Sequence, residues 1–441
     1  MESLFVRSNG GWPTRIIPWT GAWELSGPQW IAILALVALY ILLLGDWFHR
    51  AWVSLGLAIA VVLSGTITAG EAFLSVDWNT IFLLAGMMMF VAYLGDSGLF
   101  VLLGRWARAW SRGQPWRLLW VFYVVTAVIS AFLDNVTTVL LLSPILISAA
   151  EELNLDPVPL LMVEVVASNL GGMATLIGDP PNILIGTAAN LSFVEFFKIL
   201  APTALVILVA LAIVLPRFIR LGPLARNVPR AEEADTPDPS SPEKLPGLLV
   251  IMAAMLIAFV GQHQWHLEVG YIALGGAALA TLYTGGLKGR WWKHIDYGTL
   301  GFFTGVFILV GALETSGFIH HVVTWLTQPA LGPWLPYLLF FGTAVFSALL
   351  DNVPLVAALI PVLTHLVARD PQFGVQLWIA IGMGAAIGGN ATVIGASANV
   401  VAQGLAIERG YPLSFRRYAR FGLKVAGFTA LLGAAYLTVR F

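Results

Sequence analysis

The sequence lacks cysteine and has few charged residues. None of its 441 residues is Cys, which excludes disulfide bonds, thiolate metal sites and cysteine catalysis. Only 11% are Asp, Glu, Lys or Arg, whereas a soluble domain carries roughly a quarter. The formal net charge is −1 and no basic block occurs, so no nucleic-acid partner is expected. Soluble, disordered and disulfide-rich protein classes are therefore excluded.

Long apolar runs fill the chain instead. Hydrophobic residues make up 58% of it, and the mean hydropathy is +0.84. Many separate runs have or approach the length that crosses a bilayer, which predicts an all-α polytopic membrane protein. The runs span 30–44, 51–69, 78–95, 116–133, 135–150, 157–190 and 196–216, then 246–261, 268–287, 297–313, 335–350, 353–368, 374–405 and 421–440.

Composition divides the chain into four parts. Residues 1–29 are an N-terminal arm whose tryptophan rings favour the membrane interface. Residues 30–216 and 246–441 hold the two sets of apolar runs, and 217–245 is a solvated linker rich in Pro and charge. The linker is too short for a nucleotide-binding domain and no phosphate-binding Gly-rich loop occurs, so the chain carries no ATPase of its own.

The two halves repeat each other. Ser130-Ala-Phe-Leu-Asp-Asn-Val136 returns 217 positions later as Ser347-Ala-Leu-Leu-Asp-Asn-Val353. Gly171-Gly-Met-Ala-Thr-Leu-Ile-Gly178 returns at the same spacing as Gly388-Gly-Asn-Ala-Thr-Val-Ile-Gly395. The matches include Asp, Asn and paired Gly as well as interchangeable apolar residues. This pattern indicates an internal duplication.

Each half contains one hairpin and one interrupted helix. Two apolar runs join at Asp134-Asn135 and again at Asp351-Asn352, and the first arm is short for a span, which predicts re-entrant hairpins. The longer runs break near residues 178–182 and 395–399, and irregular backbone at membrane depth must line a protein-enclosed or watery site. Five crossings plus one hairpin per half make the two repeats inverted, which is typical of secondary transporters.

The distribution of Lys and Arg predicts the orientation. With both termini outside and the linker in the cytoplasm, 18 of the 23 basic residues lie in inner loops of a plasma-membrane protein. None falls in the middle of an apolar run, so we expect no Arg or Lys at membrane depth. The first apolar run lacks the flanks of a removable signal peptide, and none is expected.

Four acidic residues do lie within apolar runs: Asp134, Glu164, Asp179 and Asp351. A carboxylate there is costly unless it is paired, hydrated or protonated, so each is a candidate for proton or cation coupling. Asp134 and Asp351 are also placed to cap the second hairpin arms, and Asp179 to form a turn. The repeat counterpart of Asp179 is Ala396, so the turn does not require a carboxylate. Glu164 is either a coupling site or a partly hydrated group near the inner surface.

Amides and hydroxyls surround the same four breaks. An Asn at each break either contacts a ligand or satisfies freed backbone groups, and the symmetric positions favour ligand contact. No His or acidic cluster has metal-site spacing, so neither a metal nor an organic cofactor is expected. The candidate substrate-binding residues are Asp134, Asn135, Thr137, Thr138, Asn182, Asp351, Asn352, Thr392, Ser397 and Asn399, with Thr175 beside them.

These motifs resemble the ion transporter superfamily. Phe132-Leu-Asp-Asn-Val-Thr-Thr-Val139, Ile177-Gly-Asp-Pro-Pro-Asn-Ile183 and Gly388-Gly-Asn-Ala-Thr-Val-Ile-Gly-Ala-Ser-Ala-Asn399 are most similar to its arsenite-efflux permease and melanosomal P-protein branch, which has a citrate-transporter-like domain. The resemblance covers nearly the whole chain outside the arm and the linker. It implies a mobile transport domain built from the hairpins and broken helices, an elevator-like alternating-access movement, and a homodimer.

The resemblance also bears on the transported solute. In the dicarboxylate carriers of the superfamily the hairpin tips carry Ser-Asn-Thr, whereas this chain has Asp134-Asn-Val and Asp351-Asn-Val. A carboxylate in place of a hydroxyl repels an anion, and no basic residue at membrane depth is expected to compensate. Proton-coupled export of arsenite or antimonite is therefore expected first, with H⁺ as the coupling ion. Sodium/proton exchange is the alternative, ahead of a dicarboxylate carrier or an anion channel, and a separate ATPase partner on the inner loops stays open.

An intramembrane aspartyl protease also uses buried aspartates. In this chain Leu133 precedes Asp134 where that family has Tyr. The segment Leu176-Ile-Gly-Asp179 lacks the first glycine of the protease motif Gly-x-Gly-Asp. The chain is therefore not expected to be an enzyme.

Overall fold

Helices form nearly all of the regular structure in the residues that a computed structural model describes, which are 6–7, 13–14, 25–45, 48–223, 242–285, 293, 295–327, 331–369 and 374–441. The described part of the N-terminal arm forms two short antiparallel strands, β1 (Val6–Arg7) and β2 (Pro13–Thr14). Most of that arm and residues 224–241 of the linker lie outside the described residues. The division of the chain into four parts therefore stays a prediction.

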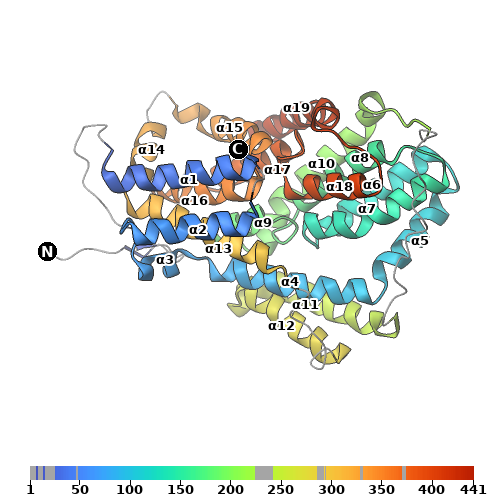
Figure 1. Ribbon diagram of the computed structural model, residues 1–441, viewed down its shortest axis with the longest axis horizontal. Coiled ribbons are helices and arrows are strands. Elements are labelled where there is room, and N and C mark those ends of the chain that lie inside the picture. Colours follow the sequence, from blue (N-terminus) through green and yellow to red (C-terminus); the bar gives the residue numbers. More distant parts are fainter. Residues whose placement is uncertain are drawn as a thin grey trace.

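The first half runs from α1 to α10 (Figure 1). Its longer helices match the predicted apolar runs, and three of them, α1, α2 and α4, precede the hairpin α6–α7 and the broken helix α8–α9. They are α1 (Gly27–Gly45), α2 (Arg50–Leu63), α3 (Ala69–Ser75), α4 (Trp78–Asp96), α5 (Leu99–Ser111), α6 (Pro115–Ser130), α7 (Asn135–Glu152), α8 (Pro157–Gly172), α9 (Pro180–Ala188) and α10 (Phe193–Phe218).

The second half repeats this order. Its helices α16 and α17 begin and end 217 positions after α7 and α8, which confirms the duplication. The elements are η1 (Pro242–Lys244), α11 (Leu245–Trp265), α12 (Val269–Thr284), α13 (Tyr297–Thr315), α14 (Phe318–Leu326), η4 (Gly332–Trp334), α15 (Leu335–Leu349), α16 (Asn352–Arg369), α17 (Gly374–Gly389), α18 (Ser397–Glu408) and α19 (Phe415–Arg440).

Several helices are long and apolar enough to cross a membrane. By length and composition there are seven such helices in the described residues, and shorter apolar helices include α1, α2, α6, α8, α12 and α17. The short α6 and α8 belong to the first hairpin and the first broken helix, as the sequence predicts. The all-α polytopic architecture with two repeats is thereby confirmed.

Three short helices were not predicted: α3, α5 and α14. Each is too short to give a bilayer-length apolar run. A capping box at Thr68 and Glu71, in which each side chain bonds the backbone of the other residue, starts α3 and is a local signal for it. Both α5 and α14 begin directly after a glycine with positive φ, Gly98 and Gly317, which lets the chain turn sharply after α4 and α13.

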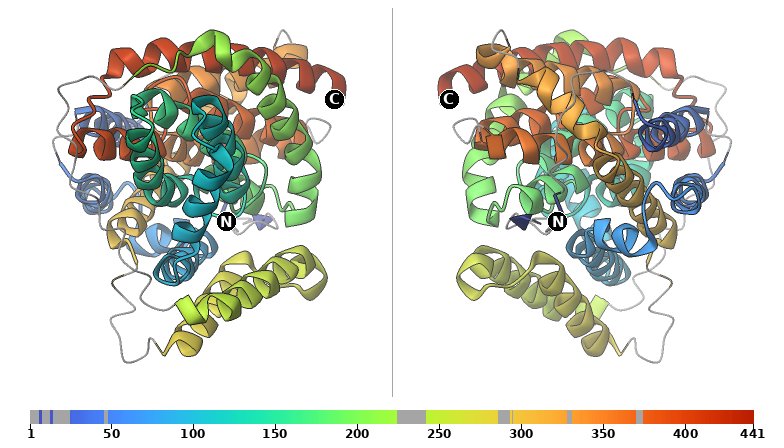
Figure 2. Two further views of the ribbon diagram at one scale, coloured as in Figure 1. Left: turned by 90° about the vertical axis from the view of Figure 1, so that its right-hand side faces the viewer. Right: turned by 90° about the vertical axis from the view of Figure 1, so that its left-hand side faces the viewer.

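The two halves interlock through their first helices. Helix α2 packs on α13 of the other repeat, and α12 packs on α4 in the same way. At both crossings a glycine allows the backbones to touch. A Cβ on Gly86 would lie 2.5 Å from the carbonyl carbon of Ala273. A Cβ on Gly305 would lie 2.5 Å from the carbonyl carbon of Ser54. Figure 2 shows α11 and α12 as a separate layer at the edge of the molecule.

The hairpins enter from opposite ends of the molecule. In Figure 1 the hairpin α6–α7 lies toward one end of the long axis and α15–α16 toward the other. The first arm of each hairpin packs tightly on the following broken helix, where a Cβ on Gly171 would lie 2.2 Å from the Ala127 carbonyl oxygen. Gly388 meets the oxygen of Ala344 at the same distance in the second half. This packing places both tips beside both helix breaks.

Candidate functional site

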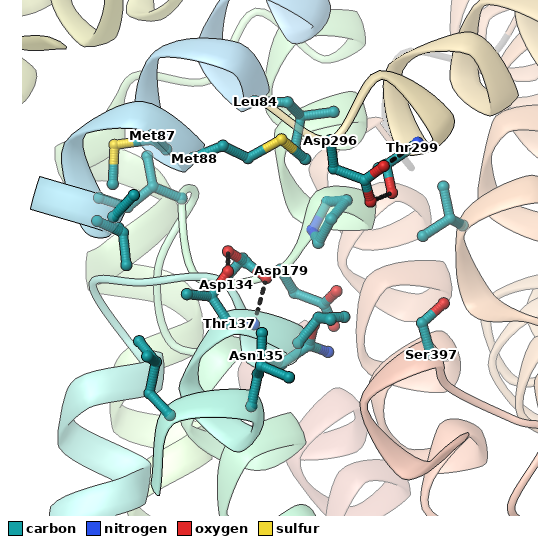
Figure 3. Close-up of a pocket in the computed structure, with 18 of the residues that line it drawn as sticks. Leu84, Met87, Met88, Asp134, Asn135, Thr137, Asp179, Asp296, Thr299 and Ser397 are labelled. Carbon is teal, nitrogen blue, oxygen red and sulfur yellow. Dashed lines mark hydrogen bonds between the residues drawn. The ribbon is translucent and has the colours of Figure 1, made fainter. Parts of the chain in front are cut away.

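A cavity of about 630 Å³ lies where the hairpin tips meet the helix breaks. In Figure 3, Asp134, Asn135 and Asp179 lie close together, Asp296 and Thr299 lie on another wall, and α4 contributes a wall of Leu84, Met87 and Met88. Seven predicted site residues line the cavity: Asp134, Asn135, Thr137, Asp179, Asp351, Asn352 and Ser397.

Asp134 at the first tip caps helix α7. The Thr137 backbone N–H donates to Asp134 Oδ1 at 2.9 Å, and the Thr137 hydroxyl donates to Asp134 Oδ2 at 2.5 Å. Both carboxylate oxygens therefore have partners from the same turn of chain. The capping role anticipated from the sequence is present, and the carboxylate still faces the cavity.

Asp351 at the second tip is held differently. Its Oδ1 accepts from the Val353 N–H at 3.0 Å, and its Oδ2 accepts from the Ser397 hydroxyl at 2.5 Å. The position that corresponds to Thr137 is Pro354, which offers neither an N–H nor a hydroxyl. The second tip therefore takes its hydroxyl partner from the start of α18 instead of from its own turn.

Asp179 has the least satisfied carboxylate at the site. It stands before α9, its side chain caps no helix, and it is only 2% exposed. Oδ2 accepts a long bond from the Asn352 amide at 3.3 Å, while Oδ1 has no hydrogen-bond partner among the described residues. A buried carboxylate oxygen without a partner is unfavourable when ionised, so this group favours a bound proton or cation.

The asparagines at the helix breaks bind backbone. Asn182 donates from Nδ2 to the carbonyls of Gly172 and Thr175 at 3.0 and 2.9 Å. Asn399 makes the two equivalent bonds one repeat later, both at 2.7 Å, to the carbonyls of Gly389 and Thr392. These amides satisfy carbonyls freed by the breaks, and neither side chain lines the cavity.

Hydroxyls tie the breaks to the hairpins. Thr175 donates its hydroxyl to the Ala131 carbonyl, and Thr392 donates to that of Ala348 at 2.6 Å. Each hydroxyl also accepts a bond from the glycine N–H three residues on. Neither threonine lines the cavity, so both hold the irregular backbone against the first hairpin arm.

Two further predicted residues lie away from the cavity lining. Glu164 is 1% exposed and accepts from the Ser143 hydroxyl at 2.8 Å, while its Oε1 has no partner among the described residues. Glu164 is therefore enclosed by protein, and its role as a coupling site stays a prediction. Thr138 is fully buried, and its hydroxyl also lacks a partner in the described part of the chain.

Sequence reasoning missed a buried asparagine network. Asn169 accepts from Asn135 Nδ2 at 3.1 Å and donates to the side-chain oxygens of Asn390 and Asn399, both at 3.0 Å. It thereby joins the first hairpin tip to the second broken helix. The signal available in the sequence was an amide inside each long apolar run, at 157–190 and 374–405.

Sequence reasoning also missed a basic residue in the cavity wall. Arg50, at the start of α2, donates to the Thr299 hydroxyl at 2.8 Å and to the Ser397 hydroxyl at 3.3 Å. Its guanidinium lies 3.9 Å from Asp296 and 5.8 Å from the centre of the Phe302 ring. Arg50 lies outside the apolar runs, as the sequence predicts, but its side chain reaches the cavity because α2 begins there.

The charged lining is nonetheless strongly acidic. Among the described residues, the cavity lining has Arg50 as the one basic residue, against five aspartates: Asp96, Asp134, Asp179, Asp296 and Asp351. Although burial opposes ionisation of Asp296, bonds from Thr299 and the nearby Arg50 charge outweigh it and lower its pKa. No group of three His, Asp or Glu side chains among the described residues is arranged to hold a metal ion.

Comparison with known proteins identifies the family. The family model described as a citrate transporter, CitMHS, matches residues 40–363 and 330–440. An uncharacterized transporter of Mycobacterium tuberculosis is 37% identical over 93% of this chain and 98% of its own length. The P protein of Mus musculus is 28% identical over 97% of this chain and 62% of its own length.

A solved structure shows weaker similarity. The YdaH transporter of Alcanivorax borkumensis, described as having an unusual topology, is 14% identical, with a TM-score of 0.45 over 93% of this chain and 98% of that one. The resemblance to the ion transporter superfamily and its P-protein branch is confirmed by the sequence matches. The chain is a multi-pass membrane transporter that belongs to the citrate transporter (CitMHS) family.

Proposed function

We propose that this protein is a proton-coupled secondary transporter in which Asp179 carries the proton and a small solute without negative charge binds between the hairpin tips. Arsenous or antimonous acid, exported across the plasma membrane, is the solute we propose first. The observation that carries the coupling role is the unpartnered Oδ1 of Asp179 beside the cavity. The equivalent position of the second half is Ala396, so this carboxylate is not needed for the fold.

The lining supports an uncharged or cationic solute. Five aspartates outnumber one arginine, and that arginine already faces Asp296, so a di- or tricarboxylate meets net repulsion. The amides of Asn135 and Asn352 and the hydroxyls of Thr137 and Ser397 offer donors and acceptors for a trihydroxide. Citrate, which the family description names, is less well matched to this cavity.

Sodium/proton exchange is the second candidate. The specific observation in its favour is the same excess of carboxylates, which suits a hard cation as well as a proton. Against it, the backbone carbonyls at both breaks that are candidates to ligate Na⁺ already accept bonds from Asn182 and Asn399.

We propose an elevator-like movement for alternating access. The transport domain comprises the hairpins α6–α7 and α15–α16 with the broken helices α8–α9 and α17–α18, which pack on one another across the two repeats. The scaffold comprises α1, α2, α4 and α11–α13, which pack together through the interlocked pairs α2–α13 and α4–α12. Termini outside, the linker in the cytoplasm and a homodimer stay part of this proposal.

The test is the lumenal pH of proteoliposomes that contain the purified protein, after separate additions of arsenite, NaCl and succinate. We expect a proton signal with arsenite that is lost in Asp179→Asn. Ala396→Asn places the same amide at the equivalent position of the second half and serves as the matched control. A signal with NaCl alone would support sodium/proton exchange, and a signal with succinate alone would overturn the charge argument.

A further inference from the structure

We propose that Arg50 is an electrostatic latch that holds the unloaded transport domain against the scaffold through Ser397 and Asp351, and that loading of Asp351 with a proton or a cation releases it. This inference rests on the proposed division into scaffold and transport domain. It assigns a coupling role to a residue that is not in any motif of the sequence, and it explains how an empty carrier is kept from crossing the membrane.

The scaffold fixes one side of Arg50. The residue begins α2, which packs closely on α13, and its Nη2 donates to the Thr299 hydroxyl on α13 at 2.8 Å. Asp296 lies before the same helix at 3.9 Å, and the Phe302 ring lies under the guanidinium at 5.8 Å. These contacts all come from α2 and α13, so the guanidinium stays with the scaffold when the transport domain moves.

The other side of Arg50 reaches the transport domain. Nη1 donates to the Ser397 hydroxyl at 3.3 Å, and that hydroxyl donates to Asp351 Oδ2 at 2.5 Å. Since a hydroxyl has one proton, accepting from Arg50 leaves Ser397 free to direct its proton at the carboxylate. The chain Arg50–Ser397–Asp351 therefore joins a fixed positive charge to a mobile negative charge across the domain boundary.

Loading weakens this chain for an electrostatic reason. The bond from Ser397 to Asp351 is strong because the carboxylate is negatively charged. When Asp351 binds a proton or a cation, this negative charge is neutralised, and the bonds that link it to Ser397 and Arg50 weaken. The other transport-domain carboxylates facing the cavity, Asp134 and Asp179, make no bond to Arg50 in the described part of the chain. By reciprocity, the ligand that releases the latch also binds more weakly while the latch is closed.

The duplication contains this arrangement once. The start of α12, equivalent to the start of α2, is the apolar Val269, and the counterpart of Ser397 is Pro180. At the first tip the Asp134 carboxylate is bonded within its own turn by Thr137. The carboxylate of the second tip is therefore the one linked to the Arg50 charge of the scaffold. One latch is sufficient because both hairpins belong to the same proposed transport domain and move together.

The test uses the absence of cysteine from the sequence. Leu140→Cys introduces a single reporter on α7 that lines the cavity, is about half exposed and lies apart from the latch. Its labelling rate by a membrane-impermeant maleimide is measured from each side of proteoliposomes, without any solute and at alkaline pH. Adding Arg50→Gln should change the ratio of the two rates on the order of tenfold, as expected for loss of one charge-assisted bond.

Three further variants keep the result specific. Ser397→Ala should reproduce the shift, and Arg50→Gln with Ser397→Ala should shift no further, because both remove the same chain of bonds. Arg440→Gln, at the end of α19, is the control and should leave the ratio unchanged. Additive effects of the first two substitutions, or an unchanged ratio with Arg50→Gln, would overturn the latch.

The latch and the proposed function fail in different ways. An unchanged labelling ratio together with a proton signal that depends on Asp179 would overturn the latch and leave the transport proposal standing. A shifted ratio in a protein that gives no proton signal with any solute would support the latch and overturn proton coupling.

Discussion

The two hairpin tips of this transporter occupy equivalent places in the fold and hold their carboxylates in different ways. At the first tip the sequence Asp134-Asn-Val-Thr137 is closed on itself, with both carboxylate oxygens bonded by Thr137. At the second tip a proline replaces that threonine, and Asp351 turns to Ser397 on the neighbouring broken helix. The comparison teaches that duplication preserved the position of the charge and changed what the charge is coupled to.

The frame around the tips is the same in both halves. The threonine hydroxyl that reaches the hairpin carbonyl, the asparagine amide that bridges two carbonyls and the glycine that touches the hairpin all recur at a spacing of 217 positions. Ser130 and Ser347 also donate equivalent bonds, each at 2.8 Å, to a carbonyl of the broken helix that follows each hairpin. These recurring groups support the broken backbone, whereas the recurring tip carboxylates differ in the hydroxyls that bind them.

The largest expected effect tests whether both tips carry charge for transport. Asp134→Asn and Asp351→Asn should each abolish proton-coupled flux, because an amide removes the carboxylate charge that each tip presents to the cavity. Asn is as good a helix cap as Asp, so folding should be retained. Flux is measured as lumenal pH change in proteoliposomes, and retained folding as an unchanged elution volume in detergent.

His320→Ala is the control for this prediction. His320 lies on α14 and does not line the cavity, so its substitution should leave flux intact. Normal transport by both asparagine variants would mean that the tips do not form the solute or proton site.

A smaller effect tests the packing of each hairpin on its broken helix, which is the same in both halves. A Cβ at Gly171 or Gly388 would lie 2.2 Å from a carbonyl oxygen of the hairpin, so Gly171→Ala and Gly388→Ala should each destabilise the protein by about 1–3 kcal/mol. Because the two contacts are equivalent, we expect similar losses, measured as the thermal unfolding midpoint in detergent. Gly275→Ala on α12, where a Cβ meets nothing within 4 Å, should cost nothing.

Unequal losses would contradict the equivalence of the two frames. A strong loss at Gly171 with none at Gly388 would mean that the second hairpin adjusts to the added methyl group, and that the two halves differ in rigidity as well as in chemistry.

Much of the fold was predictable because its signals are local and repeated. Apolar runs set the long helices, the identical spacing of the Asp-Asn pairs revealed the duplication, and Pro and Gly marked the breaks. Three aspartates (Asp134, Asp179 and Asp351) and two tip asparagines (Asn135 and Asn352) could be found because a polar group in an apolar run is costly. All five of these line the cavity.

The rest of the site depended on contacts between distant segments. Arg50 reads as an ordinary loop arginine, since nothing near it in sequence shows that α2 packs on α13 and points its first residue inward. The roles of Asn182 and Asn399 were also ambiguous, because the carbonyls they bind become free only where the backbone breaks. A sequence pattern shows where a polar group lies in an apolar run, but the residues that bind this group are known only from the tertiary fold.

The smallest expected effect tests Pro354, which stands at the second tip where the first tip has Thr137. Pro354→Thr restores the N–H and hydroxyl that Thr137 supplies at the first tip, so Asp351 gains a local partner that competes with Ser397. The stability should change by less than about 1 kcal/mol, because the added cap offsets the loss of proline rigidity. With the Leu140→Cys reporter, the labelling ratio should shift in the same direction as with Arg50→Gln but less. An unchanged ratio would show that the different bonding of the two tips has no consequence for movement, and that the asymmetry relevant to transport lies at Asp179 alone.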